Sequence, residues 1–260
     1  MKKVKKVNYI HDLGGTTTSN LHHLKHGLLF RSGNLSKIDD EGLRTLVDNY
    51  HIDNVIDLRT DDEVNQQPEE FISKAVNYLH MPLLTNEENP AVNRLNRLDI
   101  LSDLIKLPGG VKTHMKGLYR TLVSSPKAIK VYQQLFKMLL NNKDKKSFLF
   151  HCTQGKDRTG VLIFLLLKVL GVSTERAKKT YLSFNRRSFF KRVAIFLGMN
   201  IAVSPKKAVA LNRCLTAKRV YINSAIEEID VKFGGIENYI KNYLLVSDED
   251  MQTLRTMYVK

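Results

Sequence analysis

Residues 147–170 read SFLFHCTQGKDRTGVLIFLLLKVL, and this stretch decides the fold. Its opening is a short apolar run of the kind that forms a buried strand, and 159–170 is a longer apolar run typical of a buried helix. The polar residues between the two runs predict a tight loop that ends at the N-terminus of the helix. A strand joined directly to a helix in this way favours the α/β class.

The loop holds a cysteine and an arginine with five residues between them, Cys152 and Arg158. A thiol attacks only as its thiolate, and its ordinary pKa of about 8.5 leaves little thiolate at neutral pH. The free N–H groups at a helix N-terminus stabilise such a negative charge. Gly155 permits a backbone angle that a side chain would oppose, so the chain can curl around a tetrahedral dianion. The expected phosphate-binding residues are Thr153, Gln154, Gly155, Lys156, Asp157 and Arg158.

The residues around the cysteine suggest how a phosphate ester would react there. The planar guanidinium of Arg158 can bind two phosphoryl oxygens at once. Thr159 is placed to donate a hydrogen bond to the sulfur, and His151 to orient the cysteine from behind. This pattern predicts a cysteine-dependent phosphatase in which Cys152 attacks phosphorus and water hydrolyses the phosphocysteine. Cys214 has no activating neighbours in sequence, so we interpret it as structural.

The loop resembles that of the protein tyrosine phosphatase superfamily, and its GKDRTG ending is similar to that of the bacterial tyrosine-phosphatase family. Further segments fit this family: DLGG at 12–15, FRSGNL at 30–35, VIDLR at 55–59 with Glu63 after it, and FGGIENY at 233–239. The chain departs from the family pattern at His11 and at Leu28 and Leu29, where arginine is usual. The resemblance implies a phosphotyrosine-phosphatase-like fold and activity toward phosphotyrosine, with phosphoinositides as further substrates of many members.

Two aspartates are candidates for the general acid that protonates the leaving group. The chain has no tryptophan and therefore no Trp-Pro-Asp loop. Asp157 is the first candidate, because it lies in the loop beside Arg158 and resembles the aspartate that the family carries there. Asp57 is the second, because it ends a predicted strand at the carboxyl edge of the sheet. The alternative for Asp57 is an ion pair with Arg59 that only fixes the local structure.

Basic residues suggest an anionic partner. The net charge is +15, and Lys156 adds a positive charge within the loop, where phosphoinositide phosphatases carry lysine at the matching place. Between Glu175 and Arg219 the net charge is +11, from Arg176, Lys178, Lys179, Arg186, Arg187, Lys191, Arg192, Lys206, Lys207, Arg213, Lys218 and Arg219. This segment is either a solvated helical face or a surface that docks acidic peptides or anionic lipid. Phosphotyrosine proteins or peptides are the expected partners, with phosphoinositides or an anionic membrane surface as the alternative.

The remaining pattern predicts one phosphatase domain over residues 1–260, with a central, mostly parallel sheet of four to five strands flanked by helices. Short apolar runs at 28–30, 54–58, 76–79 and 148–150 are the expected strands, and helices follow the loop to the C-terminus. A helix is expected over 126–140, with Ser125 as its cap. Residues 85–124 are the least regular part, and we interpret them as a lid insertion or a plain surface insertion.

Other classes are less well supported. A rhodanese-type sulfurtransferase also places a cysteine before a helix, but it gives no reason for Arg158, Thr159 and Gly160. A phospho-ligand binding module is suggested only by the net charge, and no motif indicates nucleic acid. The histidines show no metal-ligand spacing, so neither a metal nor a cofactor is expected. Two cysteines and no long apolar segment predict a cytoplasmic chain as given, and secretion would require a leader that had been removed. No motif indicates an oligomeric state.

Overall fold

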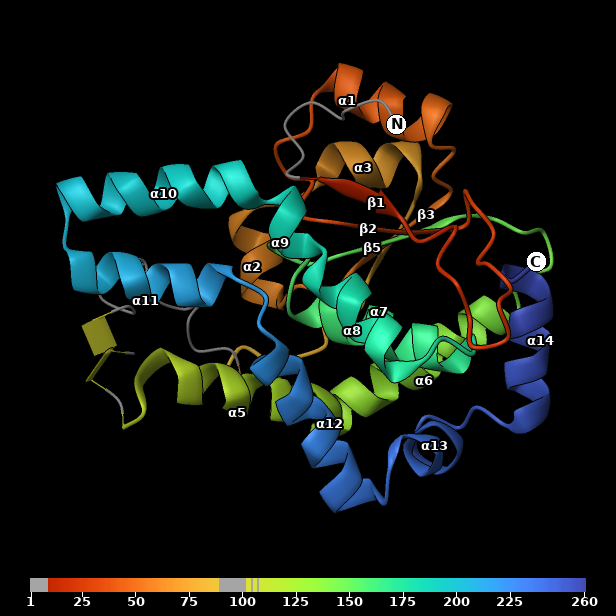
Figure 1. The fold of residues 1–260 in the computed structure, drawn as a ribbon. Coiled ribbons are helices and arrows are strands. Elements are labelled where there is room, and N and C mark those ends of the chain that lie inside the picture. Colours follow the sequence, from red (N-terminus) through yellow and green to blue (C-terminus); the bar gives the residue numbers. More distant parts are fainter. Residues whose placement is uncertain (1–8, 89–101, 104, 107) are drawn as a thin grey trace.

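The computed structural model describes residues 9–88, 102–103, 105–106 and 108–260. Its centre is a sheet in the order β1-β2-β5-β3-β4 (Figure 1). The strands are β1 (Ile10–Asp12), β2 (Leu29–Ser32), β3 (Asn54–Asp57), β4 (Asn77–His80) and β5 (Phe148–His151). β5 pairs in parallel with β2 and β3, and only the edge strand β1 is antiparallel. The predicted α/β class with a mostly parallel sheet is confirmed, and β1 was missed because it is short and half polar.

Alternate residues of the inner strands enter two different cores, because side chains of a strand point to opposite faces. Phe148 and Phe150 of β5 join the larger apolar cluster, whereas Leu149 joins the smaller one on the other face. Val55 and Ile56 of β3 divide in the same way. Helices α1 and α3 lie over the side of the smaller cluster, and α6 and α7 lie on the opposite side of the sheet (Figure 1). The loop that carries Cys152 thus begins at the buried central strand of the sheet.

The described helices follow the order predicted from the sequence, and the chain after the loop is helical. They are α1 (Asp40–Arg44), α2 (Asp61–Gln66), α3 (Glu70–Ala75), α5 (Gly110–Ser124), α6 (Pro126–Leu140), α7 (Arg158–Val169), α8 (Thr174–Leu182), α9 (Phe184–Arg187), α10 (Phe189–Ala202), α11 (Pro205–Leu215), α12 (Arg219–Phe233), α13 (Ile236–Asn238) and α14 (Asp248–Tyr258), with π-type turns at Thr45–Asn49 and Tyr239–Tyr243.

The bounds of α6 and its N-cap position at Ser125 match the prediction, but the side-chain hydrogen bond expected of a cap is not formed. Ser125 precedes the helix, yet its buried hydroxyl makes no hydrogen bond with any described residue. The fixed backbone of Pro126 in the first turn is the signal that placed this helix correctly.

The segment 85–124 divides into two parts. Its last fifteen residues form α5, and Met115, Tyr119 and Leu122 on this helix are buried in the larger core. This part is therefore a core helix and not a lid. Most of 89–107 lies outside the described residues, so the lid stays a prediction for that part alone. Among the described residues, no helix has both the length and the apolar character that a membrane crossing needs.

Candidate active site

The loop that carries Cys152 leaves the central strand at the carboxyl edge of the sheet and enters α7 at Arg158. Cys152 is almost fully buried, as are Arg158 and Thr159. Strand β3 lies beside β5 with Asp57 opposite His151, so the residue that ends β3 stands next to the start of the loop. The topology therefore brings together the two sequence segments in which we expected catalytic residues.

Gly155 is held at the floor of the loop in a left-handed conformation, with φ at +68°. Its carbonyl oxygen accepts hydrogen bonds of 2.6 Å from the hydroxyl of Tyr9 and 2.5 Å from Nη2 of Arg31, both buried. A Cβ here would lie 2.0 Å from the carbonyl oxygen of Ser32. Glycine is therefore required, and the predicted role of Gly155 is confirmed in its geometry. Tyr9 and Arg31 are structural partners of the loop that sequence reasoning did not identify.

Two more loop carbonyls accept hydrogen bonds, in each case from a backbone amide. The oxygen of Thr153 accepts from the amide of Asn34 at 3.2 Å, and that of Asp157 from the amide of Val161 at 2.9 Å. By contrast, the amides of residues 153–158 donate to no acceptor within the described part of the chain. Carbonyls that are occupied and amides that are free make the loop a ready site for a tetrahedral anion.

Arg158 is fixed by Glu63, which sequence reasoning noted only as part of a family segment. Nη2 of Arg158 donates to Oε1 of Glu63 at 2.8 Å, Nη1 donates to Oε2, and the hydroxyl of Thr153 donates to the same carboxylate. Burial alone would raise the pKa of Glu63, but the charge and hydrogen bonds of Arg158 lower it to about 2. Glu63 thus holds the guanidinium beside the loop as a permanent anion. Nothing near Glu63 in the sequence predicts this contact.

Asp157 is the more accessible of the two acid candidates, with 21% of its side chain exposed. Its Oδ1 accepts a hydrogen bond of 2.6 Å from the hydroxyl of Tyr119 and lies 2.8 Å from Nζ of Lys156. Tyr119 in turn lies 2.7 Å from the hydroxyl of Tyr181. The carboxyl group is therefore positioned by two helices, α5 and α8, and not by the loop alone.

The ammonium group of Lys156 is held by partners from the loop and from two later helices. Its ammonium group is fully buried and donates a hydrogen bond of 2.6 Å to the carbonyl oxygen of Cys214, besides its ion pair with Asp157. It also sits 6.0 Å from the centre of the Tyr221 ring. α11 and α12 thus supply partners for the ammonium besides Asp157, and the contact of this lysine with a bound phosphate stays a prediction.

Asp57 is fully buried and bound to Arg59, as the alternative interpretation predicted. Its carboxylate accepts from Nε of Arg59 at 2.8 Å and from the hydroxyl of Tyr78 at 2.7 Å. Burial alone would raise the pKa of Asp57, but the charges of His151 and Arg59 and these hydrogen bonds hold it well below its ordinary value. A carboxylate that keeps its ionised form so firmly is a poor proton donor. This geometry favours the structural role of Asp57.

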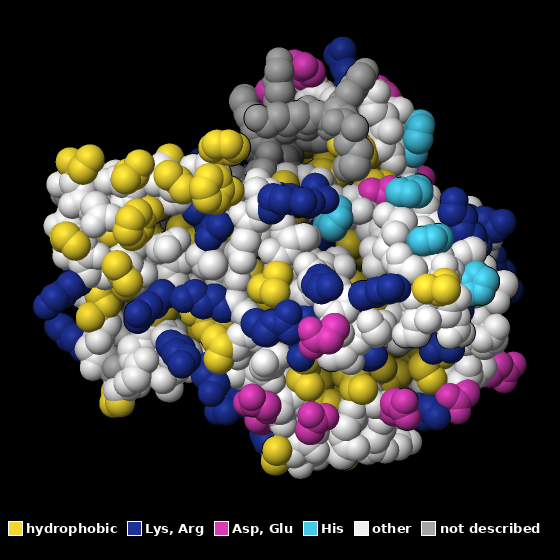
Figure 2. Space-filling model, in the orientation of Figure 1, with side chains coloured by type: hydrophobic (Ala, Val, Ile, Leu, Met, Phe, Trp, Pro, Cys, Tyr) yellow, Lys and Arg dark blue, Asp and Glu magenta, His cyan; other side chains and the backbone are white. Residues whose placement is uncertain are grey.

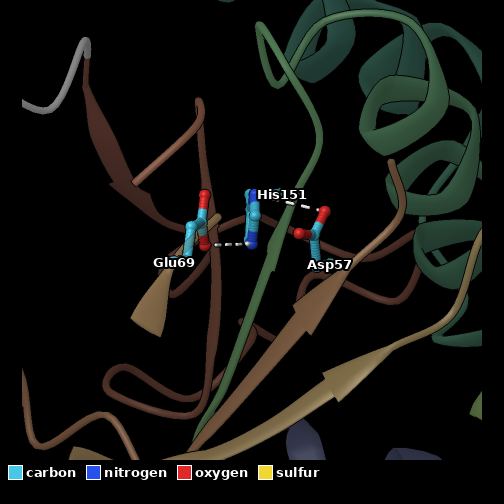
Figure 3. Close-up of side chains that lie close together, drawn as sticks. All are labelled: Asp57, Glu69 and His151. Carbon is cyan, nitrogen blue, oxygen red and sulfur yellow. Dashed lines mark ion pairs between the residues drawn. The ribbon is translucent and has the colours of Figure 1, made fainter. Parts of the chain in front are cut away.

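His151 lies between two buried carboxylates, those of Asp57 and Glu69 (Figure 3). Its Nε2 is 3.3 Å from Oε2 of Glu69, and its Nδ1 is 3.8 Å from Oδ1 of Asp57. These three side chains are close enough to ligate a metal ion, but Arg59 already pairs with both carboxylates. The positive charge of Arg59 therefore offsets the charge of the two carboxylates. The cluster links the ends of β5 and β3 behind the loop.

Thr159 is placed differently from the prediction. Its hydroxyl is buried in the first turn of α7 and has no hydrogen-bond partner, sulfur included, among the described residues. The expected hydrogen bond to Cys152 is thus absent in this structure. The side chain of Gln154 is half-buried, and no partner for it is found in the same part of the chain.

Comparison with known proteins agrees with this geometry. A model of the family described as "Tyrosine phosphatase family" matches residues 3–260. A Cupriavidus necator protein whose name places it among the tyrosine-protein phosphatases is 28% identical over 95% of this chain and 84% of its own length. The triple specificity protein phosphatase PtpB of Mycobacterium tuberculosis is 23% identical over 89% of each chain. The similarity spans the whole described structure and not the loop alone.

Proposed function

The chain belongs to the tyrosine phosphatase family, and we propose that it hydrolyses phosphotyrosine in proteins or peptides through a phosphocysteine on Cys152. One observation carries the proposal: the amides of residues 153–158, which follow Cys152 directly, donate to no acceptor in the described part of the chain, and Arg158 is held in the same loop by Glu63. A sulfurtransferase gives no reason for Arg158, Thr159 and Gly160, and an assay with thiosulfate against one with a phosphate ester separates the two classes. A binding module would not need a nucleophile in the same loop.

The first chemical step forms a sulfur–phosphorus bond and breaks the bond between phosphorus and the phenolic oxygen of tyrosine. The thiolate of Cys152 attacks in line with that leaving oxygen, and Asp157 gives the oxygen its proton. In the second step a water molecule gives a proton to Asp157 and attacks phosphorus, and the thiolate leaves. The loop amides stabilise the charge on the equatorial oxygens throughout.

Arg158 can join this binding without leaving Glu63. Its Nε donates to no acceptor among the described residues, and its Nη2 makes a second bond of 3.2 Å to the hydroxyl of Thr153. If Thr153 gives way, the edge formed by Nε and Nη2 can bind two phosphoryl oxygens in parallel. The edge formed by Nη1 and Nη2 stays paired with Glu63, and this pair keeps the guanidinium in place.

The nucleophile is tested by replacing each of the two cysteines with serine. Cys152→Ser is expected to abolish hydrolysis of a phosphotyrosine peptide, whereas Cys214→Ser, the matched control, is expected to keep it because only the backbone carbonyl of that residue contacts the loop. Acid quenching of wild type during turnover of a radiolabelled peptide should trap phosphate on the protein. Hydrolysis by Cys152→Ser at the wild-type rate would contradict the proposal.

Phosphoinositides are a second proposed substrate class. The support is the family resemblance and the basic surface of α8 to α12. The charge of Lys156 is already paired with Asp157. A panel of phosphopeptides and short-chain phosphoinositides, measured as phosphate release, separates the two classes. If only the peptides turn over, the lipid proposal fails and the phosphotyrosine proposal stands.

A further inference from the structure

Helix α10 exposes its apolar side chains to the solvent. Phe190 and Ile201 are 85% and 88% exposed, and the exposed large hydrophobic residues on or beside this helix are Phe189, Phe190, Val193, Leu197, Ile201 and Val203. Figure 2 shows hydrophobic side chains gathered along α10 at the edge of the molecule. A surface helix of a soluble protein normally buries such a face. Packing in the core therefore does not explain why this face of α10 is apolar.

The exposed residues form one row, here called the α10 stripe: Phe190, Val193, Leu197 and Ile201. Their spacing of three and four residues keeps them on one side of the helix, over about 16 Å. Arg192 points the other way, with Nη1 donating to Thr216 at 2.7 Å and Nη2 to the carbonyl of Asn185 at 3.0 Å. Arg192 is thus turned toward the protein, whereas the α10 stripe is turned away from it.

The surroundings of the stripe carry only positive charge. No aspartate or glutamate occurs between Arg176 and Ile226. Exposed basic residues flank the stripe on both sides in the sequence, with Arg186 and Arg187 on α9, Lys206 at the start of α11 and Arg213 near its end. Lys and Arg side chains lie along α11 beneath the hydrophobic edge (Figure 2). An apolar row with a basic border is the pattern of a helix that lies on an anionic membrane.

We propose that the α10 stripe inserts into the surface of an anionic lipid bilayer, with the basic residues of α9 and α11 in contact with lipid head groups. Helix α10 packs on α11, and the pair projects from the body of the protein, so the stripe is an edge and not a groove for a peptide (Figure 1). A second copy of the chain would bring another net charge of +15 against the first, whereas an anionic surface is attracted. The proposal does not depend on the reaction at Cys152.

The test is co-sedimentation of the full chain with vesicles that contain no phosphorylated inositol. Wild type is expected to bind vesicles of phosphatidylcholine with about 30% phosphatidylserine, and to bind pure phosphatidylcholine weakly. Phe190→Asp and Ile201→Asp should each weaken binding roughly tenfold or more, because each places a charge where the interface buries an apolar side chain. Val231→Asp is the matched control, because Val231 is equally exposed but lies on α12. It should bind like wild type.

Hydrolysis of a soluble phosphotyrosine peptide shows that each variant is folded, since neither Phe190 nor Ile201 contacts the loop. If these variants bind the anionic vesicles as tightly as wild type, the proposal is overturned. It is also overturned if wild type does not bind them at all. A wild-type dimer that Phe190→Asp converts to a monomer would assign the stripe to a second copy of the chain instead.

Discussion

The hydroxyl of Tyr119 lies 2.6 Å from Oδ1 of Asp157 and donates a hydrogen bond to it. The two residues are far apart in sequence, and Tyr119 reaches the loop from helix α5. Tyr119 is fully buried and is itself in hydrogen-bond contact with Tyr181. The buried phenol of Tyr119 therefore orients the carboxyl group of Asp157, the proposed general acid.

We expect Tyr119→Phe to lower kcat for a phosphotyrosine peptide roughly fivefold to tenfold, because the hydrogen bond that orients Asp157 is lost while the ring stays in place. KM should change little, since the phosphate is bound by other groups. Tyr239→Phe is the matched control: it removes a buried phenol hydrogen bond of 2.7 Å, to the carbonyl of Val123, away from the site. If both variants keep the wild-type kcat, Tyr119 does not position the acid.

Asp57→Asn tests the structural role of Asp57 against catalysis. The substitution removes one of the two buried carboxylates that pair with Arg59 and leaves Glu69 as the other, so we expect the free energy of unfolding to fall by about 3 kcal/mol. The shape of the pH–rate profile should not change. Asp157→Asn should instead remove the basic limb of that profile and lower kcat roughly 100-fold or more. Urea unfolding and kcat/KM against pH distinguish the two, and loss of the basic limb in Asp57→Asn would reverse the assignment.

Glu63 makes the stability of the protein sensitive to acid. Its pKa is lowered from 4.5 to about 2 in the folded state, because Arg158 outweighs the effect of burial. Above pH 4.5 this stabilisation is fully present, and it is lost as the pH falls toward 2, since the unfolded chain then binds a proton that the folded one does not. The contribution of Glu63 to the free energy of unfolding that is lost in this way is about 3 kcal/mol.

Glu63→Gln should therefore flatten the pH dependence of unfolding between pH 5 and pH 2, while the variant is less stable than wild type at pH 7. The measurement is urea unfolding at a series of pH values. Glu227→Gln on α12 is a suitable control, because Glu227 is exposed. A slope in Glu63→Gln equal to that of wild type would mean that the ion pair with Arg158 is absent in solution.

Gly155→Ala is expected to lower kcat/KM roughly 100-fold or more. The added Cβ would meet the carbonyl oxygen of Ser32 at 2.0 Å, and φ of +68° is unfavourable for alanine, so the loop must move. Gly117→Ala on α5 meets no atom within 4 Å and should raise helix stability slightly without changing activity. Unchanged activity in Gly155→Ala would show that the loop adopts another conformation.

The sequence alone determined what depends on neighbours along the chain. The run from Phe148 to Leu170 defined a buried strand, a loop and a helix, and the pattern of Cys152, Gly155 and Arg158 indicated the chemistry. Local start and stop signals are of the same kind: the hydroxyl of Ser173 caps α8, and Gly234 ends α12 in a left-handed conformation. Each of these features is set by backbone preference or by spacing within a few residues.

Only the tertiary structure decided which groups surround the loop. The pairing of Glu63 with Arg158 and of Tyr119 with Asp157 joins residues that no spacing rule connects. The side on which Lys156 finds its partner depends on α11 and α12, which follow much later in the chain. The exposure of the apolar side chains of α10 depends on how this helix packs on α11. Contacts of this kind form when elements meet in space, so local propensity does not encode them.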